Sequence, residues 1–130
     1  MQLDRKYIIC ALIYAIFGML LGIYMGAAQN HGQFVTHAHI LLVGFVVSFV
    51  YGVLHKVWLV RPPVRLATIQ FYLHHVSAIV MFIALFLLFG NFVPEDVAGP
   101  MLGLSSVAVL IGLLMMLYMV VRSSRPADTP

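Results

Sequence analysis

The sequence predicts an all-α integral membrane protein: a four-helix bundle with up-down-up-down topology, in a single transmembrane domain over residues 1–130. Of these residues 63% are hydrophobic and only 8% are charged, whereas soluble domains carry about 25% charged residues. Four apolar runs reach the roughly 20 residues that a membrane-spanning helix needs. The composition excludes an ordinary soluble enzyme. It also excludes nucleic acid as a partner, because the 7 basic residues are too few for a phosphate-binding tract.

The four spans are expected at residues 7–28, 36–58, 66–89 and 99–121. Short breaks rich in Gly, Pro and Asn separate them, so neighbouring helices should be antiparallel. All Lys and Arg residues fall on one side of these spans: Arg5, Lys6, Lys56, Arg61, Arg65, Arg122 and Arg125. The positive-inside rule makes that side cytoplasmic and predicts that both termini are inside.

The second span carries a polar stripe. Its members are spaced by four and three residues: His37, Leu41, Gly44, Ser48, Tyr51 and His55. At about 100° per residue they share one helix face, which must point into the protein. His39 lies about 160° from that face, so we expect it to point toward another subunit or the outer interface.

The third span carries two adjacent histidines. His74 shares a small and polar face with Gln70 and Ser77, and this face is the natural partner of the stripe on the second span. His75 is turned by about 100° and lies beside Phe71. We interpret His75 as either an axial ligand of a large apolar cofactor or an interfacial hydrogen-bond donor.

Depth limits which histidines act together. The loops place His74 and His75 level with Tyr51, and His37 and His39 level with residues 24–27 of the first span. His39 and His75 then differ in height by roughly 15 Å at 1.5 Å per residue. In an undistorted hairpin they cannot be the two axial ligands of one iron.

Small residues mark the first and fourth spans. They are Ala11, Ala15, Gly18, Gly22 and Gly26 on the first, and Gly99, Gly103 and Gly112 on the fourth. We interpret these stripes as close helix packing in lipid. The alternative is that they make room for a flat cofactor.

Histidine inside a membrane span is costly, and by default it indicates function. We expect b-type haem, which needs one or two histidines at its iron and an apolar, aromatic slot. The candidate ligands are His37, His39, His74 and His75, and further candidate cofactor contacts are Gly44, Ser48, Tyr51 and Met25. Copper is the alternative cofactor, with His31, His37, His39, Met25 and Met101 as ligands, because imidazole and thioether both suit that metal.

Residues 36–45, THAHILLVGF, resemble the second helix of the haem–copper oxidase catalytic subunit, subunit I. The whole chain is more closely similar to small four-helix bacterial membrane proteins described as subunit-I-like. These share a His-Ala-His segment opening the second helix and a histidine in the aromatic start of the third, here residues 71–75. The resemblance implies haem binding, with the low-spin haem ligand at His37 or His39. The other metal ligands of the oxidase lie on later helices that have no counterpart in this sequence, so the resemblance does not imply oxygen reduction at a haem–copper centre.

The expected function is therefore haem b binding in a bacterial inner membrane. The protein would serve electron transfer or redox and gas chemistry, with a respiratory-chain donor or acceptor as its partner. Histidines on divergent faces further predict a homo-oligomer. Two alternatives stay open: a copper-binding or copper-handling membrane protein, and a non-catalytic accessory subunit of a respiratory complex. No residue is predicted to be catalytic.

Overall fold

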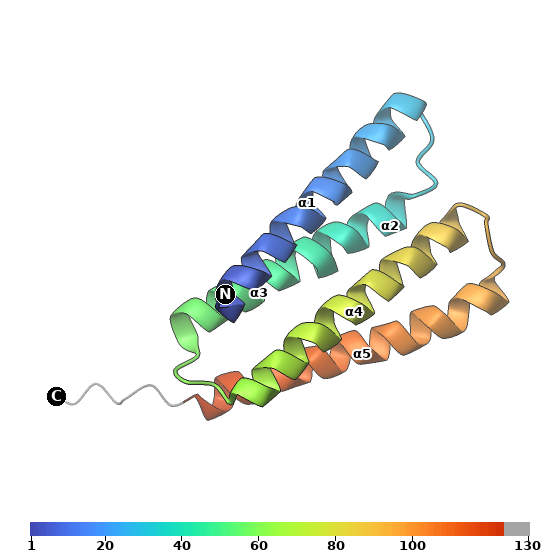
Figure 1. Cartoon of the computed structure of the whole chain (residues 1–130). Coiled ribbons are helices and arrows are strands. Elements are labelled where there is room, and N and C mark those ends of the chain that lie inside the picture. The colour runs from blue at the N-terminus through green and yellow to red at the C-terminus, as the bar shows by residue number, and fades with distance from the viewer. Residues whose placement is uncertain (124–130) are drawn as a thin grey trace.

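The computed structural model describes residues 1–123 and confirms four helical spans (Figure 1). They are α1 (Leu3–Ala28), a second span over Phe34–Trp58, α4 (Val64–Phe89) and α5 (Glu95–Arg122). Each begins up to one turn earlier than expected. In α1 and α5 the extra turn contains Asp4 or Glu95, and carboxylates stabilise helix N-termini by opposing the helix dipole. Arg125 lies outside the described residues.

The second span is not a uniform α-helix. It runs through α2 (Phe34–His39), the π-helix η1 (Ile40–Val47), α3 (Ser48–Val53) and a second π-helix, η2 (Leu54–Trp58). The sequence analysis did not predict these wide turns, and no proline in the span marks them. π-Helical turns are rare and occur often at functional sites.

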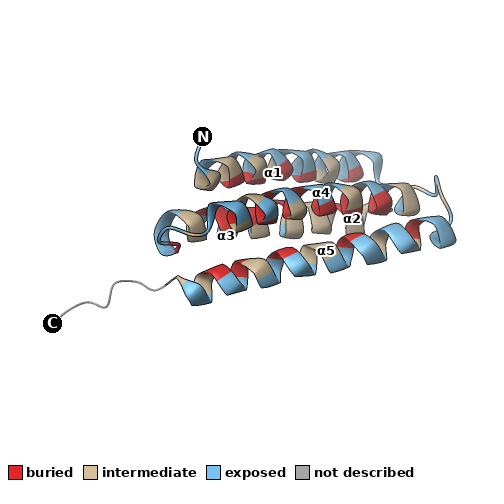
Figure 2. Cartoon of the chain, turned by 60° about the horizontal axis from the view of Figure 1, so that its bottom comes forward, coloured by how far each residue is buried: buried red, intermediate tan, exposed pale blue. Residues whose placement is uncertain are grey.

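Helix α4 is the centre of the fold. Helix α1 packs along η1 and α3 in one hairpin, and α5 packs along α4 in the other. Helix α4 also contacts α1 and α2, so it joins the two hairpins, and Figure 2 shows its red, buried surface between α1 and α5. In the most apolar 18-residue segment of α4, half of the residues are buried inside the protein. In the corresponding segments of the other three spans, 17–22% are buried.

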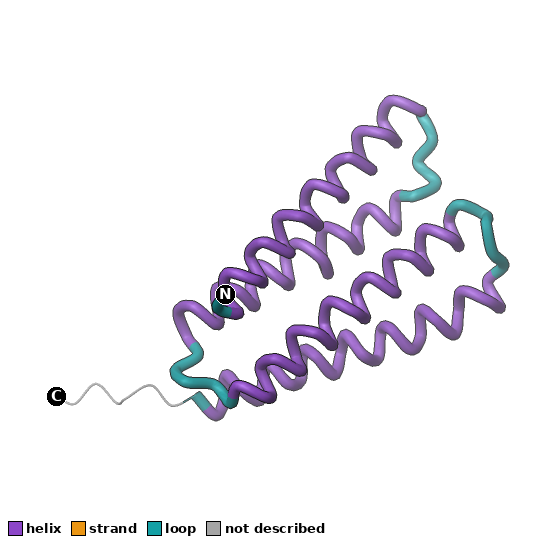
Figure 3. The backbone as a smooth tube through the Cα atoms, in the orientation of Figure 1, coloured by secondary structure: helices purple, strands orange, loops and turns teal. Residues whose placement is uncertain are grey.

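The basic residues gather at one end of the molecule. This basic end contains the start of α1, the connection 59–63, the start of α4 and the end of α5 (Figure 3). Six described basic residues lie there: Arg5, Lys6, Lys56, Arg61, Arg65 and Arg122. The turns over 29–33 and 90–94 lie at the opposite end. The separation of charge that the sequence predicted is therefore confirmed.

The predicted small-residue stripes are only partly correct. Gly18 lies against Leu41, Gly22 against the His37 ring, and Gly112 close to the backbone of His74. A Cβ atom on Gly26, Gly99 or Gly103 would meet nothing within 4 Å. Three of the predicted glycines therefore allow close packing, and these other three face open space.

The predicted height of His37 is wrong. His37 lies level with Gly22, deeper than the expected residues 24–27. The cause is that α1 extends beyond the start of the second span, so the turn runs back down before Phe34 (Figure 1).

Candidate functional site

The first group of candidate side chains lies between the hairpins and centres on His74. This residue is completely buried in α4, and its Nε2 lies 2.9 Å from Ser48 Oγ. The Tyr51 ring meets the His74 ring edge-on, with centroids 5.0 Å apart. Ser48 and Tyr51 of the predicted stripe therefore face the polar face of α4, at the depth that the sequence predicted. His37, which belongs to the same predicted stripe, instead meets Gly18 and Gly22 of α1.

His75 occupies a separate aromatic pocket. Its Nδ1 lies 3.0 Å from the Tyr14 hydroxyl of α1. Four rings surround the imidazole, those of Tyr7, Tyr14, Phe71 and His74, with centroids 4.5–5.7 Å away. Of its two interpretations, the hydrogen bond between helices is the one that the geometry displays. We call His74 and His75 the inner pair.

A buried glutamine links three helices beside the inner pair. The Tyr7 hydroxyl of α1 donates to Oε1 of Gln70 on α4. The Gln70 Nε2 donates in turn to the Gly112 carbonyl of α5 at 3.2 Å. Tyr7 and Gln70 are both fully buried. Such a polar link fixes the relative position of α1, α4 and α5 in a lipid-surrounded bundle.

Five buried polar atoms have no hydrogen-bond partner among residues 1–123. They are Asp4 Oδ1, Tyr51 OH, His55 Nε2, His74 Nδ1 and His75 Nε2. The Tyr7 ring links several of these groups, because it stacks on His55 at 5.5 Å and lies 5.6 Å from Tyr51. Buried polar groups without partners are uncommon and call for an explanation. These five atoms extend from the inner pair to the basic end.

The second group, which we call the outer pair, is His37 and His39 on α2. His37 Nδ1 lies 2.8 Å from the Gly18 carbonyl oxygen, and His39 Nδ1 lies 2.9 Å from that of Val35. A carbonyl oxygen only accepts hydrogen bonds, so each Nδ1 must carry the proton. Each Nε2 then presents a lone pair, which is the form in which histidine binds metals.

The two members of the outer pair differ in their surroundings. The His37 ring is held against Gly22, where an added Cβ would lie 2.8 Å from His37 Cε1. His39 is half-buried, and among residues 1–123 its bond to Val35 within the same helix is its one hydrogen bond. The divergent orientation predicted for these two residues is consistent with this difference.

Two contacts fix the depth of the outer pair relative to the inner pair. Gln33 Nε2 donates to the Phe86 carbonyl at 3.0 Å, and Ser48 bonds to His74. His39 lies nine residues before Ser48, which is at most about 13 Å along the span, because the wide turns of η1 rise less per residue than an α-helix. This separation agrees with the sequence analysis, so one iron cannot be shared between His39 and the inner pair.

The remaining predicted ligands lie on α1, on the turn over 29–33 and on α5. Among the described residues, no group of three or more His, Cys, Asp or Glu side chains is positioned to hold a metal ion. His31 is exposed in the turn, and Met25 is buried in α1. Met101 lines an apolar cavity of about 220 Å³ between α4 and α5. Gly44 packs against the Tyr14 side chain.

The sequence analysis missed the contribution of α1. Tyr7 and Tyr14 are seven residues apart, on the same face as the buried Ala11 and Gly18. That spacing was visible in the sequence, but the small residues drew the interpretation toward helix packing. The tyrosines instead provide the hydroxyl groups that meet Gln70 and His75.

Comparison of the chain with protein-family models, curated proteins and solved structures finds no match to any of them.

Proposed function

We propose that this chain is a multi-pass membrane protein that binds b-type haem through Nε2 of His39. One observation carries the proposal: the hydrogen bond from His39 Nδ1 to the Val35 carbonyl. It fixes the tautomer and orients the ring, as hydrogen bonds from metal-ligating histidines generally do. His39 is also half-buried rather than enclosed, and the resemblance to oxidase subunit I gives this segment the same role.

The inner pair fits a haem less well. His75 Nε2, the nitrogen that an iron would meet, is buried, and the rings of Tyr7, Tyr14 and Phe71 lie 4.5–5.7 Å from the imidazole. A haem at this position would have to displace them. His74 Nε2 is bonded to the Ser48 hydroxyl, which can either donate or accept the hydrogen bond. The bond therefore does not fix which nitrogen of His74 is free to bind a metal. We therefore assign His74 and His75 to a hydrogen-bond network that organises the bundle, and we assign the iron to His39.

A bound b-type haem would supply one-electron redox chemistry and, at a free axial position, binding of a diatomic gas. The residues of α2 would hold and orient it. The Val35 carbonyl keeps the His39 ring in place and raises the basicity of its Nε2. Because the inner pair lies deeper along the second span, it would not supply a second ligand to the same iron. We expect such a ligand from another copy of the chain.

The test is an absorption spectrum of the detergent-purified protein, oxidised and then reduced with dithionite, with a pyridine haemochrome assay on the same sample. We expect a Soret band and b-type haem at a fixed ratio to the chain. Sharp reduced α and β bands would indicate a six-coordinate haem, in which a second ligand fills the other axial position. A broad high-spin spectrum would leave that position for a gas. Failure to take up haem after expression with ample haem would refute the proposal.

We further propose that the basic end faces the cytoplasm of a bacterial cell, on the strength of the positive-inside rule. The substitution Ser123→Cys in a Cys10→Ala background tests this orientation, because it leaves a single thiol at the end of α5. In intact spheroplasts we expect a membrane-impermeant maleimide to leave the introduced thiol unlabelled until the cells are lysed. Labelling before lysis would show that the basic end faces outward.

A further inference from the structure

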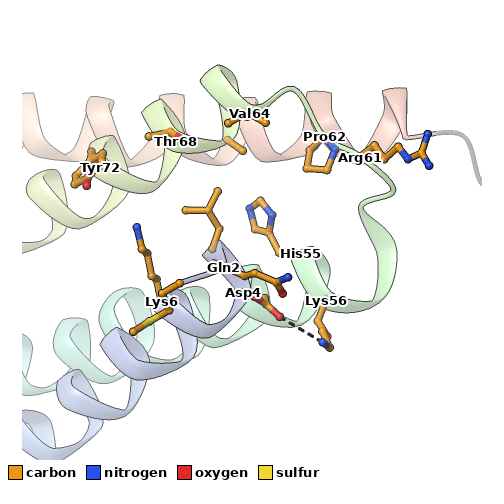
Figure 4. Close-up of a pocket in the computed structure, with 13 residues that line it drawn as sticks. Gln2, Asp4, Lys6, His55, Lys56, Arg61, Pro62, Val64, Thr68 and Tyr72 are labelled. Carbon is orange, nitrogen blue, oxygen red and sulfur yellow. Dashed lines mark ion pairs between the residues drawn. The ribbon is translucent and has the colours of Figure 1, made fainter.

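A cavity of about 750 Å³ opens at the basic end, between the two hairpins. The first turns of α1 and η2 form one side, and the connection 59–63 with the start of α4 forms the other (Figure 4). A volume of this size is typical of small-molecule sites. The cavity lies apart from His39, which is near the opposite end of the second span.

The charges that line this cavity are mostly positive. Lys6, Lys56 and Arg61 contribute cations, and Asp4 is the one acidic residue in its wall. Asp4 already pairs with Lys56, at 3.7 Å from Oδ2 to Nζ. Among residues 1–123, Lys6 and Arg61 have no carboxylate partner. Lys6 Nζ lies over the Phe71 ring, 6.0 Å from its centroid. The cavity therefore has an excess of positive charge that no carboxylate of the described chain neutralises.

The side chains of the wall are arranged to meet a polar ligand. In Figure 4, Lys6 and His55 extend from the first hairpin toward α4, whereas Lys56 turns toward Asp4. Thr68 adds a hydroxyl from the opposite wall. His55 Nε2 and Asp4 Oδ1, both in the lining residues, are buried without a partner in the described chain. Two orphaned polar atoms at one cavity are a second indication of a ligand, independent of the charge.

We propose that this cavity binds a phosphate group, held by the Lys6 ammonium and the His55 imidazole. Arg61 lies at the rim of the cavity with an exposed side chain, and its guanidinium points away from Lys6 and His55 (Figure 4). The cavity lies at the ends of the spans, which is the level of lipid head groups, and basic pockets between helices at this level bind anionic lipids. Either a phospholipid head group or a soluble phosphate compound has this chemistry.

Native mass spectrometry of the full chain in detergent, with added lipid, tests the proposal. We expect phosphatidylglycerol to be retained in preference to phosphatidylcholine. Lys6→Gln should weaken retention about fivefold, because one basic residue near the membrane surface contributes about that factor. Lys6→Arg should preserve retention, which separates the loss of charge from a failure to fold. The matched control is Arg122→Gln, which removes the same charge at the same end but outside the cavity.

A competition experiment distinguishes the two sources of phosphate. If a large excess of glycerol phosphate leaves the bound lipid in place, the ligand is the lipid head group; displacement assigns the site to a soluble phosphate compound. Equal retention of the two lipids together with no change in the ³¹P line width of glycerol phosphate on adding protein would overturn the proposal. An equal loss in Lys6→Gln and Arg122→Gln would also overturn it, because binding would then follow surface charge alone. Neither variant should change the Soret band, so the site is testable apart from the haem.

Discussion

The outer and inner histidine pairs use the same side chain in opposite ways. His37 and His39 bond to backbone carbonyls, which only accept, so the protonated nitrogen is fixed. His74 and His75 bond to hydroxyl groups of Ser48 and Tyr14, which accept or donate. A carbonyl partner thus prepares an imidazole as a metal ligand. A hydroxyl partner does not fix which imidazole nitrogen is protonated, and it joins the imidazole to a hydrogen-bond network.

The largest effect is expected at His39. We predict that His39→Ala lowers the haem content of the purified protein at least tenfold, because the proposed ligand is lost, and that added imidazole restores a Soret band. His74→Ala should retain haem with the same spectrum. If the two variants exchanged these outcomes, the iron would belong to the inner pair and the comparison would be reversed.

Substitutions at two glycines should disturb the outer and inner histidine pairs one at a time. Gly22→Ala would place a Cβ 2.8 Å from the His37 ring, and Gly44→Ala would place one 2.8 Å from the Tyr14 ring. Overpacking of this kind costs about 1–3 kcal/mol, measurable as a lowered melting temperature in detergent. The first variant should disturb the outer pair and the second the Tyr14–His75 bond. Gly26→Ala is the control, because its Cβ would meet nothing within 4 Å. If it lowered the melting temperature as much as the other two variants, overpacking would not be the cause of their effect.

Gln70 tests the network around the inner pair. Gln70→Leu keeps a side chain of similar size but removes the links to the Tyr7 hydroxyl and the Gly112 carbonyl. We expect a loss of about 1–2 kcal/mol in the free energy of unfolding without loss of haem. Ser106→Ala, at an exposed position on α5, should be neutral. A neutral Gln70→Leu would show that the link contributes nothing to stability.

The smallest effect is predicted for Ser48→Ala. It removes one hydrogen bond to His74 Nε2, and such bonds average about 0.6 kcal/mol in membrane proteins. Thermal unfolding in detergent followed by circular dichroism measures the change. A loss above about 2 kcal/mol would mean that Ser48 has a larger part in the network than one bond.

Much of the fold could be predicted because the physical signals are local. Long apolar runs indicate the spans, and spacings of four and three place Ser48 and Tyr51 on the face that meets His74. The partners of the histidines could not be predicted in the same way. The pairing of Tyr14 with His75, and of Tyr7 with Gln70, depends on the relative rotation and depth of two helices that are not neighbours in sequence. A shift of a few residues, such as the one that set His37 against Gly22, changes which atoms meet.

The π-helical stretch Ile40–Val47 has a consequence for insertions and deletions. Each of its hydrogen-bonded rings contains one residue more than an α-helical ring. Removing one residue there converts the wide turn into an α-helical turn. The stripe residues before and after it then stay on the helix faces that they occupy now. Removing one residue from α4 instead turns everything beyond it by about 100° and carries the buried face out to lipid. The second span therefore tolerates a change of length that α4 does not.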